Sequence, residues 1–125
     1  MRICNAQIQR DTGLWYSAEY STFSISDEVG NYQLTVAGYS GDAGDALANA
    51  NSWRLANGMM FSTRDSDSDT GWMNCASDYY AGWWYSECTA SVINRNINGI
   101  WGDIDTPLYM LTSNVLASRM LVKII

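Results

Sequence analysis

Alternation of polar and apolar residues predicts β-strands towards both ends of the chain. The segments 22–26 and 32–36 alternate in this way, and turn-forming residues at 27–31 separate them, so we predict an antiparallel pair. The C-terminal segment 116–124 is also rich in strand-forming residues. One face of its period-two pattern carries Leu116, Met120, Val122 and Ile124. We predict that this segment closes the sheet.

A long region of weak periodicity lies between these strands, from Gly38 to about Asp105. It is rich in Gly, Asn, Asp and Ser, and its helical periodicity is weak apart from a turn at 45–48. Loops of this length in a compact domain are usually functional or disordered. The aromatic residues and cysteines of this region favour a function.

A dense cluster of oxygen ligands occupies the middle of that region. Asp65, Asp67 and Asp69 alternate with serines, and carboxylates so close together repel one another unless solvent or a cation screens them. Hard cations such as calcium take carboxylate and backbone carbonyl oxygens. The same alternation is typical of a solvated, disordered loop, but such loops are poor in aromatic residues, and six tryptophans and tyrosines follow between positions 72 and 85. We therefore interpret the segment as a calcium loop.

An EF-hand does not fit this loop. Counted from Asp65, the sixth and twelfth positions, which an EF-hand fills with glycine and glutamate, hold Thr70 and Ala76. An acid/base active site does not fit either, because the three aspartates are too close in sequence to flank a substrate from two sides. We predict that the chain is not an enzyme.

Composition narrows the classes of partner. A length of 125 residues allows one domain, and 13 acidic against 7 basic residues give a net charge of −6, so phosphate backbones are repelled and no nucleic acid is expected. No apolar run approaches the roughly 20 residues of a membrane span. Histidine is absent, which excludes the common zinc sites and histidine-dependent triads. Of three cysteines, one stays unpaired after any single disulfide, and Cys4 is predicted to be a small buried hydrophobe in a strand.

Several longer motifs follow one another in an order typical of a known family. They are Tyr20-Ser-Thr-Phe23, Asn31-Tyr32-x-Leu34-x-Val36-x-Gly38-Tyr39-Ser40-Gly41-x-Ala43-Gly44-Asp45, Asn57-Gly58-Met59-x-Phe61-Ser62-Thr63-x-Asp65, Asn74-Cys75-Ala76, Trp83-Trp84 and Met120-x-Val122-Lys123-Ile124. In these motifs the chain resembles the C-terminal part of a fibrinogen-related domain, the globular module of fibrinogen, ficolins, tachylectins, angiopoietins and tenascins. The resemblance implies an α+β fold: one truncated domain over 1–125, with a small antiparallel sheet and a loop-rich calcium and ligand subdomain at 57–105.

The resemblance also implies a calcium site and a disulfide. By position, the calcium ligands are the side chains of Asp67 and Asp69 and the backbone carbonyls of Gly71 and Met73, with an affinity on the order of 10⁻⁴–10⁻³ M. Asp65 becomes a second-sphere or solvated charge.

The family's disulfide corresponds to Cys75 and Cys88, and the bond before its second cysteine is often a cis peptide. We therefore expect a cis bond between Glu87 and Cys88. Disulfides and weak calcium sites belong outside the cell, yet no signal peptide precedes the first strand, so we expect an excised piece of a secreted protein.

In lectin-like members of the family, a small pocket beside the calcium loop holds an acetyl group. The matching positions here are Asp78, Tyr79, Cys88 and Thr89, while Trp83 and Trp84 are expected in the core beneath them. The chain departs from the family pattern at Thr89, where histidine is common, and a loop that carries pocket tyrosines is deleted after residue 95. Trp101 or Tyr109 is the expected replacement.

These observations lead to two functional hypotheses. The first is a secreted, calcium-stabilised, lectin-like module that binds acetylated carbohydrates or microbial surface ligands, as in innate immunity. The second is a protein-binding adhesion or receptor-ligand module of the angiopoietin or tenascin type, which binds a cell-surface protein. Because the family's N-terminal subdomain is missing ahead of Met1, an exposed sheet edge and a homo-oligomer are expected as well.

Overall fold

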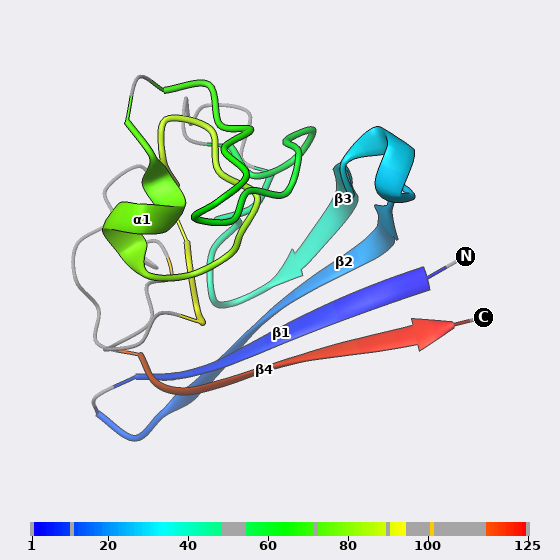
Figure 1. The fold of residues 1–125 in the computed structure, drawn as a ribbon. Coiled ribbons are helices and arrows are strands. Elements are labelled where there is room, and N and C mark those ends of the chain that lie inside the picture. Colours follow the sequence, from blue (N-terminus) through cyan, green and yellow to red (C-terminus); the bar gives the residue numbers. More distant parts are fainter. Residues whose placement is uncertain are drawn as a thin grey trace.

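A four-stranded antiparallel sheet forms the frame of the molecule (Figure 1). The computed structural model describes residues 2–10, 12–48, 55–71, 73–89, 91–94, 101 and 115–124. The strands are β1 (Arg2–Arg10), β2 (Trp15–Ile25), β3 (Leu34–Gly41) and β4 (Val115–Ile124), in the order β3-β2-β1-β4. The helices of the described residues are short: η1 (Glu28–Gly30) and α1 (Cys75–Tyr79). Strand is the main regular structure of the described part, so the small antiparallel sheet is confirmed, whereas the predicted α+β class is not.

The predicted hairpin is present as β2 and β3. Phe23 pairs with Val36 and Ile25 pairs with Leu34. In the turn, the side chain of Asp27 accepts a hydrogen bond from the Gly30 N–H, which caps η1. The period-two pattern on each side of a capped turn was therefore enough to predict that β2 and β3 form a hairpin.

The predicted C-terminal strand is also present, and it pairs with β1. Met120 and Val122 lie opposite Ala6 and Cys4, so they share the face that carries the core. Leu116 was predicted on that face too, but it is 58% exposed, and Val115 is buried instead. A shift in register between Gln9 and Arg10 causes the difference, because a one-residue shift exchanges the two faces of a strand.

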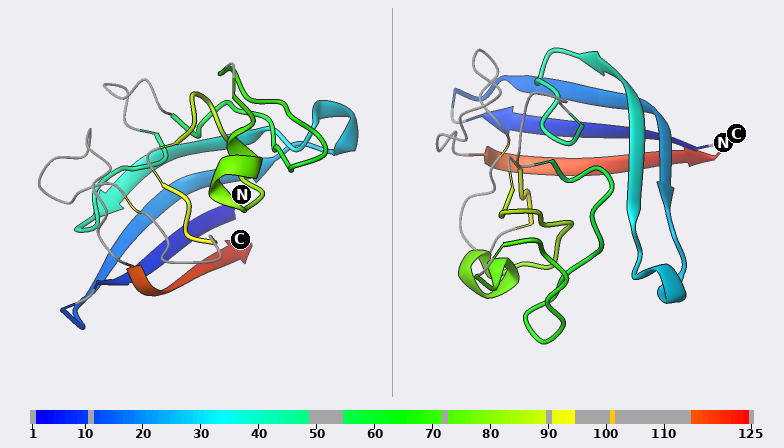
Figure 2. Two further views of the ribbon diagram at one scale, coloured as in Figure 1. Left: turned by 60° about the vertical axis from the view of Figure 1, so that its left-hand side comes forward. Right: turned by 90° about the horizontal axis from the view of Figure 1, so that it is seen from above.

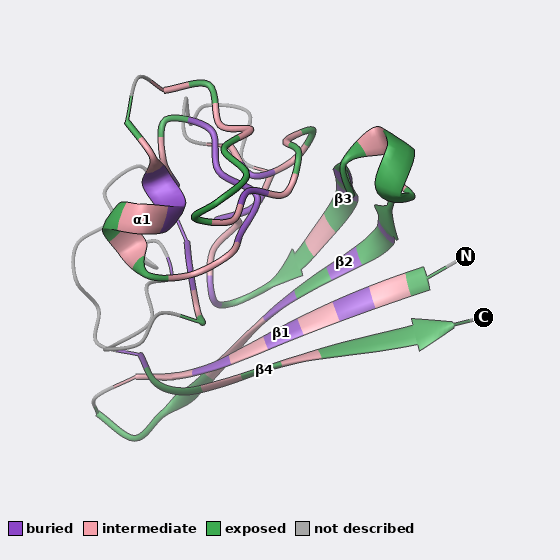
Figure 3. Cartoon of the chain, viewed as in Figure 1, coloured by how far each residue is buried: buried purple, intermediate pink, exposed green. Residues whose placement is uncertain are grey.

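The core lies between one face of the sheet and the irregular segments that cover it (Figure 2). Buried residues alternate along β1 (Figure 3). They belong to one core cluster with buried residues of the loops and of α1. The sheet contributes Cys4, Ala6, Ile8, Ala18, Tyr20, Phe23, Leu34, Val36 and Val115; the irregular segments contribute Leu47, Cys75, Trp83, Trp84, Tyr85, Val92 and Trp101. The outer end of β4 stays exposed, including Val122 and Ile124.

Among the described residues, neither helix has the length and apolar character needed to cross a membrane.

The thiol of Cys4 is fully buried in this core, as the sequence predicts. Burial disfavours the thiolate and raises the pKa of Cys4 to about 11. We therefore expect no alkylation of Cys4 by iodoacetamide at pH 8 in the native protein and complete alkylation in urea, measured by mass spectrometry. Rapid labelling of the folded protein would contradict this placement.

The raised pKa of Cys4 also links stability to pH. Its contribution is complete below the ordinary thiol value of about 8.5 and is lost as the pH rises through 11, because only the unfolded state releases the proton in that interval. Urea unfolding of the wild type and of Cys4→Ala at several pH values measures it. As the pH rises, the free energy of unfolding of the wild type is expected to fall more than that of Cys4→Ala. The buried Tyr20, whose pKa is also raised, contributes equally to the pH dependence of both proteins.

Candidate functional site

The acidic loop begins at a pair of backbone hydrogen bonds that fix it to the aromatic segment. Ser62 and Trp83 exchange N–H···O=C bonds of 2.9 and 3.1 Å. Beyond this bridge, Thr63 and Ser66 close a turn with reciprocal bonds of 3.0 and 3.1 Å, and the buried Ser62 hydroxyl accepts from the Ser68 N–H at 2.9 Å. The loop is therefore held by local turn chemistry as well as by the core.

The three aspartates of this loop divide into a pair and a single residue. Asp65 accepts a hydrogen bond of 2.8 Å from the Thr63 hydroxyl, which lowers the pKa of this exposed carboxyl. Asp67 accepts from the Asp69 N–H at 3.1 Å, and the carboxylate of Asp69 accepts from the N–H groups of Gly71 and Cys75 at 3.1 and 3.0 Å. Asp69 thus joins the loop to the first residue of α1.

Asp67 and Asp69 lie close enough to influence each other. Desolvation raises the pKa of Asp69, and the neighbouring carboxyl of Asp67 raises it further, although the N–H of Cys75 opposes the shift. Within the described segments, no group of three or more acidic, thiol or imidazole side chains converges on one point. A cation held here would therefore have two carboxylates as its side-chain donors. A hard cation fits such a pair because it removes the repulsion between the two charges.

A disulfide joins the two ends of the segment that follows the acidic loop. Cys75 and Cys88 are bonded, with 5.5 Å between their Cα atoms, so the predicted pairing is confirmed. Asn74 caps α1 by accepting from the Ser77 N–H at 3.1 Å, and its amide donates to the Arg64 carbonyl at 3.0 Å. The helix start is thereby connected to both the disulfide and the acidic loop.

The predicted cis bond between Glu87 and Cys88 is wrong, since both residues are described and this peptide is trans. In its place the chain makes a tight trans turn. The Ser86 N–H donates to the Cys88 carbonyl at 2.7 Å, and the Ser86 carbonyl accepts from the Thr70 N–H at 3.3 Å. These bonds satisfy the backbone on either side of Glu87 without a cis peptide.

The predicted ligand contacts occupy different environments. Asp78 is exposed, Tyr79 and Cys88 are half-buried, and Tyr79 stacks on Tyr85 with 5.9 Å between the ring centres. Thr89 is buried, and its hydroxyl donates to the Ser91 carbonyl at 2.6 Å. These four assignments as ligand contacts stay predictions.

Trp101, the fifth predicted contact, lies in the core. Its indole N–H donates to the Gly44 carbonyl at 3.0 Å. Tyr109 lies outside the described residues. The expectation that Trp83 and Trp84 belong to the core is confirmed, because both are buried and their rings meet edge to face at 5.1 Å.

Sequence reasoning did not single out Tyr80 as a contact residue. Its side chain is 63% exposed at the C-terminal end of α1, where the backbone adopts a left-handed conformation with φ of 57°. Non-glycine residues in this region are uncommon and costly. No sequence signal distinguished Tyr80 from its buried aromatic neighbours, because exposure depends on how α1 packs.

Comparisons with known proteins identify the family to which this sequence and fold are similar. The family model for the C-terminal globular domain of fibrinogen beta and gamma chains matches residues 3–107. Protein scabrous of Drosophila melanogaster is 39% identical over 108 residues, which is 85% of this chain and 12% of scabrous. Angiopoietin-related protein 6 of Mus musculus is 43% identical over 84 residues, which is 67% of this chain and 16% of that protein.

A solved structure shows the same fold. The fibrinogen-like globe domain of human ANGPTL6 superimposes with a TM-score of 0.80 at 28% identity, over 98% of this chain and 56% of the globe domain. The chain therefore spans little more than half of that domain, and a far smaller share of the two curated relatives.

Removal of the disulfide is expected to lower the free energy of unfolding by about 3 kcal/mol, because the bond closes a short loop in the unfolded chain. The double variant Cys75→Ser, Cys88→Ser measured by urea unfolding gives this value. Cys4→Ser is the control for a lost thiol outside the disulfide. A double variant as stable as the wild type would show that the bond constrains little.

Proposed function

Because the chain belongs to the family of fibrinogen C-terminal globular domains, which are non-enzymatic binding modules, we propose that it is an extracellular recognition module for a cell-surface protein. In this proposal, the acidic loop and α1 carry the contact surface, and the disulfide and a calcium ion keep that surface in one shape. A preorganised surface binds more tightly because less conformational entropy is lost on binding.

The observation that carries this proposal is the contrast between buried and exposed residues around the disulfide. Thr89 and Trp101, two of the residues expected to line an acetyl pocket, are buried, and their polar groups already have partners. The exposed side chains near the ends of α1 are instead Met73, Tyr80 and Asp78. Tyrosine and methionine are enriched in protein interfaces, and exposed carboxylates favour a partner with basic groups.

One observation favours the lectin-like alternative. Tyr79 stacks on Tyr85, lies in the same short helix as Cys75 and is only half-buried. An aromatic face of this kind can contact an acetyl methyl group. Acetylated carbohydrates and microbial surface ligands are therefore the second candidate ligands.

Calcium enters the proposal through the paired carboxylates. Asp67 and Asp69 would hold the ion with their side chains, and Gly71 and Met73 with their backbone carbonyls. The bound ion supplies the positive charge that offsets the repulsion within the pair. The chain's own hydrogen bonds from Gly71 and Cys75 already orient the Asp69 carboxylate for this role.

Calcium at about 2 mM is expected to raise the free energy of unfolding by about 0.6–1.8 kcal/mol, for an affinity on the order of 10⁻⁴–10⁻³ M. The double variant Asp67→Asn, Asp69→Asn should lose this increment. Asp65→Asn should keep it, because an amide oxygen still accepts from Thr63. Urea unfolding with calcium, magnesium or EDTA measures the effect, and an equal loss in Asp65→Asn would contradict the assignment.

Tyr80→Asn is expected to weaken binding to cultured animal cells at least about fivefold, because it removes an exposed interface ring. Asparagine tolerates the left-handed backbone at this position. The matched control is Tyr32→Asn, since Tyr32 is also exposed and also has a positive φ, of 56°, but lies in the β2–β3 turn.

Flow cytometry of the labelled protein measures this binding, with and without protease treatment of the cells and with N-acetylglucosamine as competitor. Loss after protease treatment and indifference to the sugar are the expected results. Protease-resistant binding that the sugar abolishes would favour the lectin-like alternative. Equal effects of Tyr80→Asn and Tyr32→Asn would contradict the proposal that α1 carries the contact surface.

A further inference from the structure

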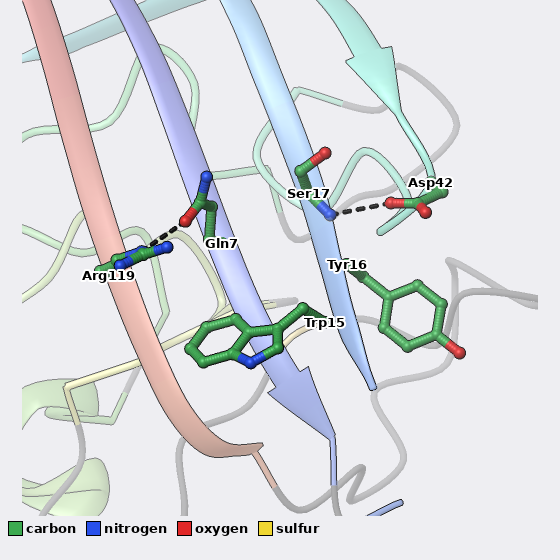
Figure 4. Close-up of a pocket in the computed structure, with 6 residues that line it drawn as sticks. All are labelled: Gln7, Trp15, Tyr16, Ser17, Asp42 and Arg119. Atoms are coloured by element: carbon green, nitrogen blue, oxygen red, sulfur yellow. Dashed lines mark hydrogen bonds between the residues drawn. The ribbon is translucent and has the colours of Figure 1, made fainter. Parts of the chain in front are cut away.

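A polar cleft lies on the outer face of the sheet, away from the acidic loop (Figure 4). Its volume is about 270 Å³, and it is lined by Gln7, Trp15, Tyr16, Ser17, Asp42 and Arg119. Gln7 lies directly opposite Ser17 on β2 and Arg119 on β4, so three strands contribute one row of side chains. Gln7, Trp15, Ser17 and Arg119 alternate along the strands with core-facing residues and therefore project from the face opposite the core, whereas Tyr16 lies opposite Ile8 and packs against the core.

One side of the cleft holds a positioned positive charge. The Nε of Arg119 donates to the side-chain oxygen of Gln7, and the guanidinium lies over the ring of Trp15, 5.4 Å from its centre. A guanidinium carries five N–H donors, so the four on its terminal nitrogens are not used by Gln7. These two contacts restrict the side chain before any ligand arrives, which lowers the entropy lost on binding.

The other side of the cleft holds a positioned negative charge. The Ser17 carbonyl accepts from the N–H groups of Asp42 and Ala43 at 3.0 and 2.9 Å, while the Ser17 N–H donates to Oδ1 of Asp42 at 2.8 Å. This close approach requires glycine at position 41, where φ is +129° and a Cβ atom would lie 2.2 Å from the Ser17 carbonyl oxygen. The second carboxylate oxygen of Asp42 has no partner among the described residues.

The two charges do not neutralise each other. In the described part of the chain no ion pair joins Arg119 to Asp42. Each side chain instead bonds to a neighbouring strand: Arg119 donates to Gln7, and Asp42 accepts from the Ser17 N–H. The space between them is bordered by the indole of Trp15, which is 48% exposed. The cleft thus offers a fork of donors, a carboxylate acceptor and an apolar surface within one small volume.

We infer that this cleft binds a small zwitterion, an α-amino acid with an apolar side chain. Its carboxylate would accept from the guanidinium of Arg119, its ammonium group would donate to Asp42, and its side chain would contact Trp15. A ligand with one charge leaves the other wall without a partner, and a long polyanion is disfavoured by the net charge of −6 and by Asp42 itself. The site is independent of the acidic loop.

Titration of ¹⁵N-labelled protein with L-leucine tests this inference, in the presence of EDTA so that the result does not depend on calcium. We expect leucine to shift the indole N–H signal of Trp15 and the side-chain amide signals of Gln7. The analogues 4-methylpentanoate and 3-methylbutylamine each lack one charge and should bind about tenfold more weakly or worse. D-glucuronate, titrated in the same way, tests an acidic sugar as the occupant.

Two variants remove one charge each. Arg119→Gln and Asp42→Asn should both weaken leucine binding about tenfold or more. The asparagine oxygen still accepts from the Ser17 N–H, so Asp42→Asn keeps the backbone geometry. Lys123→Gln removes a cation from the same strand and the same face and should leave the affinity unchanged, and urea unfolding verifies that all three variants are folded.

Three results would overturn the inference. The Trp15 and Gln7 signals could stay unmoved up to the solubility limit of leucine. The single-charge analogues, or D-glucuronate, could bind as well as leucine does. Finally, Lys123→Gln could weaken binding as much as Arg119→Gln, which would indicate a nonspecific electrostatic effect.

Discussion

Hydrogen bonds along the outer edge of β3 fix the point at which the irregular segments leave the sheet. Leu34 donates to the Met59 carbonyl at 3.0 Å and accepts from the Gly58 N–H at 2.8 Å. The Val36 N–H donates to the side chain of Asn57 at 2.9 Å. An uncovered edge strand presents unpaired backbone groups that invite another chain. Here residues 57–59 bond to the first part of that edge, at Leu34 and Val36, and the following chain passes onto the inner face.

Between residues 59 and 94, the described segments have only isolated bridges and one short helix, and buried side chains add hydrogen bonds to distant backbone groups. The indole of Trp84 donates to the Tyr32 carbonyl at 2.8 Å, and the indole of Trp101 donates to the Gly44 carbonyl at 3.0 Å. Trp84 and Trp101 therefore both fill the core and satisfy a distant backbone carbonyl. Buried core contacts therefore position the acidic loop and the disulfide on one face of the sheet. The separate cleft lies on the opposite, outer face.

Particular residues show where sequence reasoning succeeded and where it did not. The hairpin, the last strand, the burial of Cys4 and the Cys75–Cys88 bond were predictable, because alternation, turn residues and family motifs each identify them locally. The fibrinogen-like fold followed from the same motifs. The predicted cis peptide at Glu87 was not found, because a trans turn closed by Ser86 already satisfies the backbone there. Family position assigned Thr89 to the ligand pocket, and that assignment stays a prediction; in the structure its hydroxyl donates to the Ser91 carbonyl.

The first strand, β1, was not predicted from the sequence. Sequence patterns did predict the β2–β3 hairpin with its turn, the strand β4, the oxygen-rich character of the acidic loop and the absence of histidine chemistry. All of these depend on neighbouring residues or on composition. The packing of the folded chain determines that Val115 rather than Leu116 enters the core, that Tyr80 is exposed, and that Arg119 on β4 and Asp42, which follows β3, border one cleft. The physical reason is that strand register and packing are set jointly by several segments, so no single segment encodes which distant side chains meet.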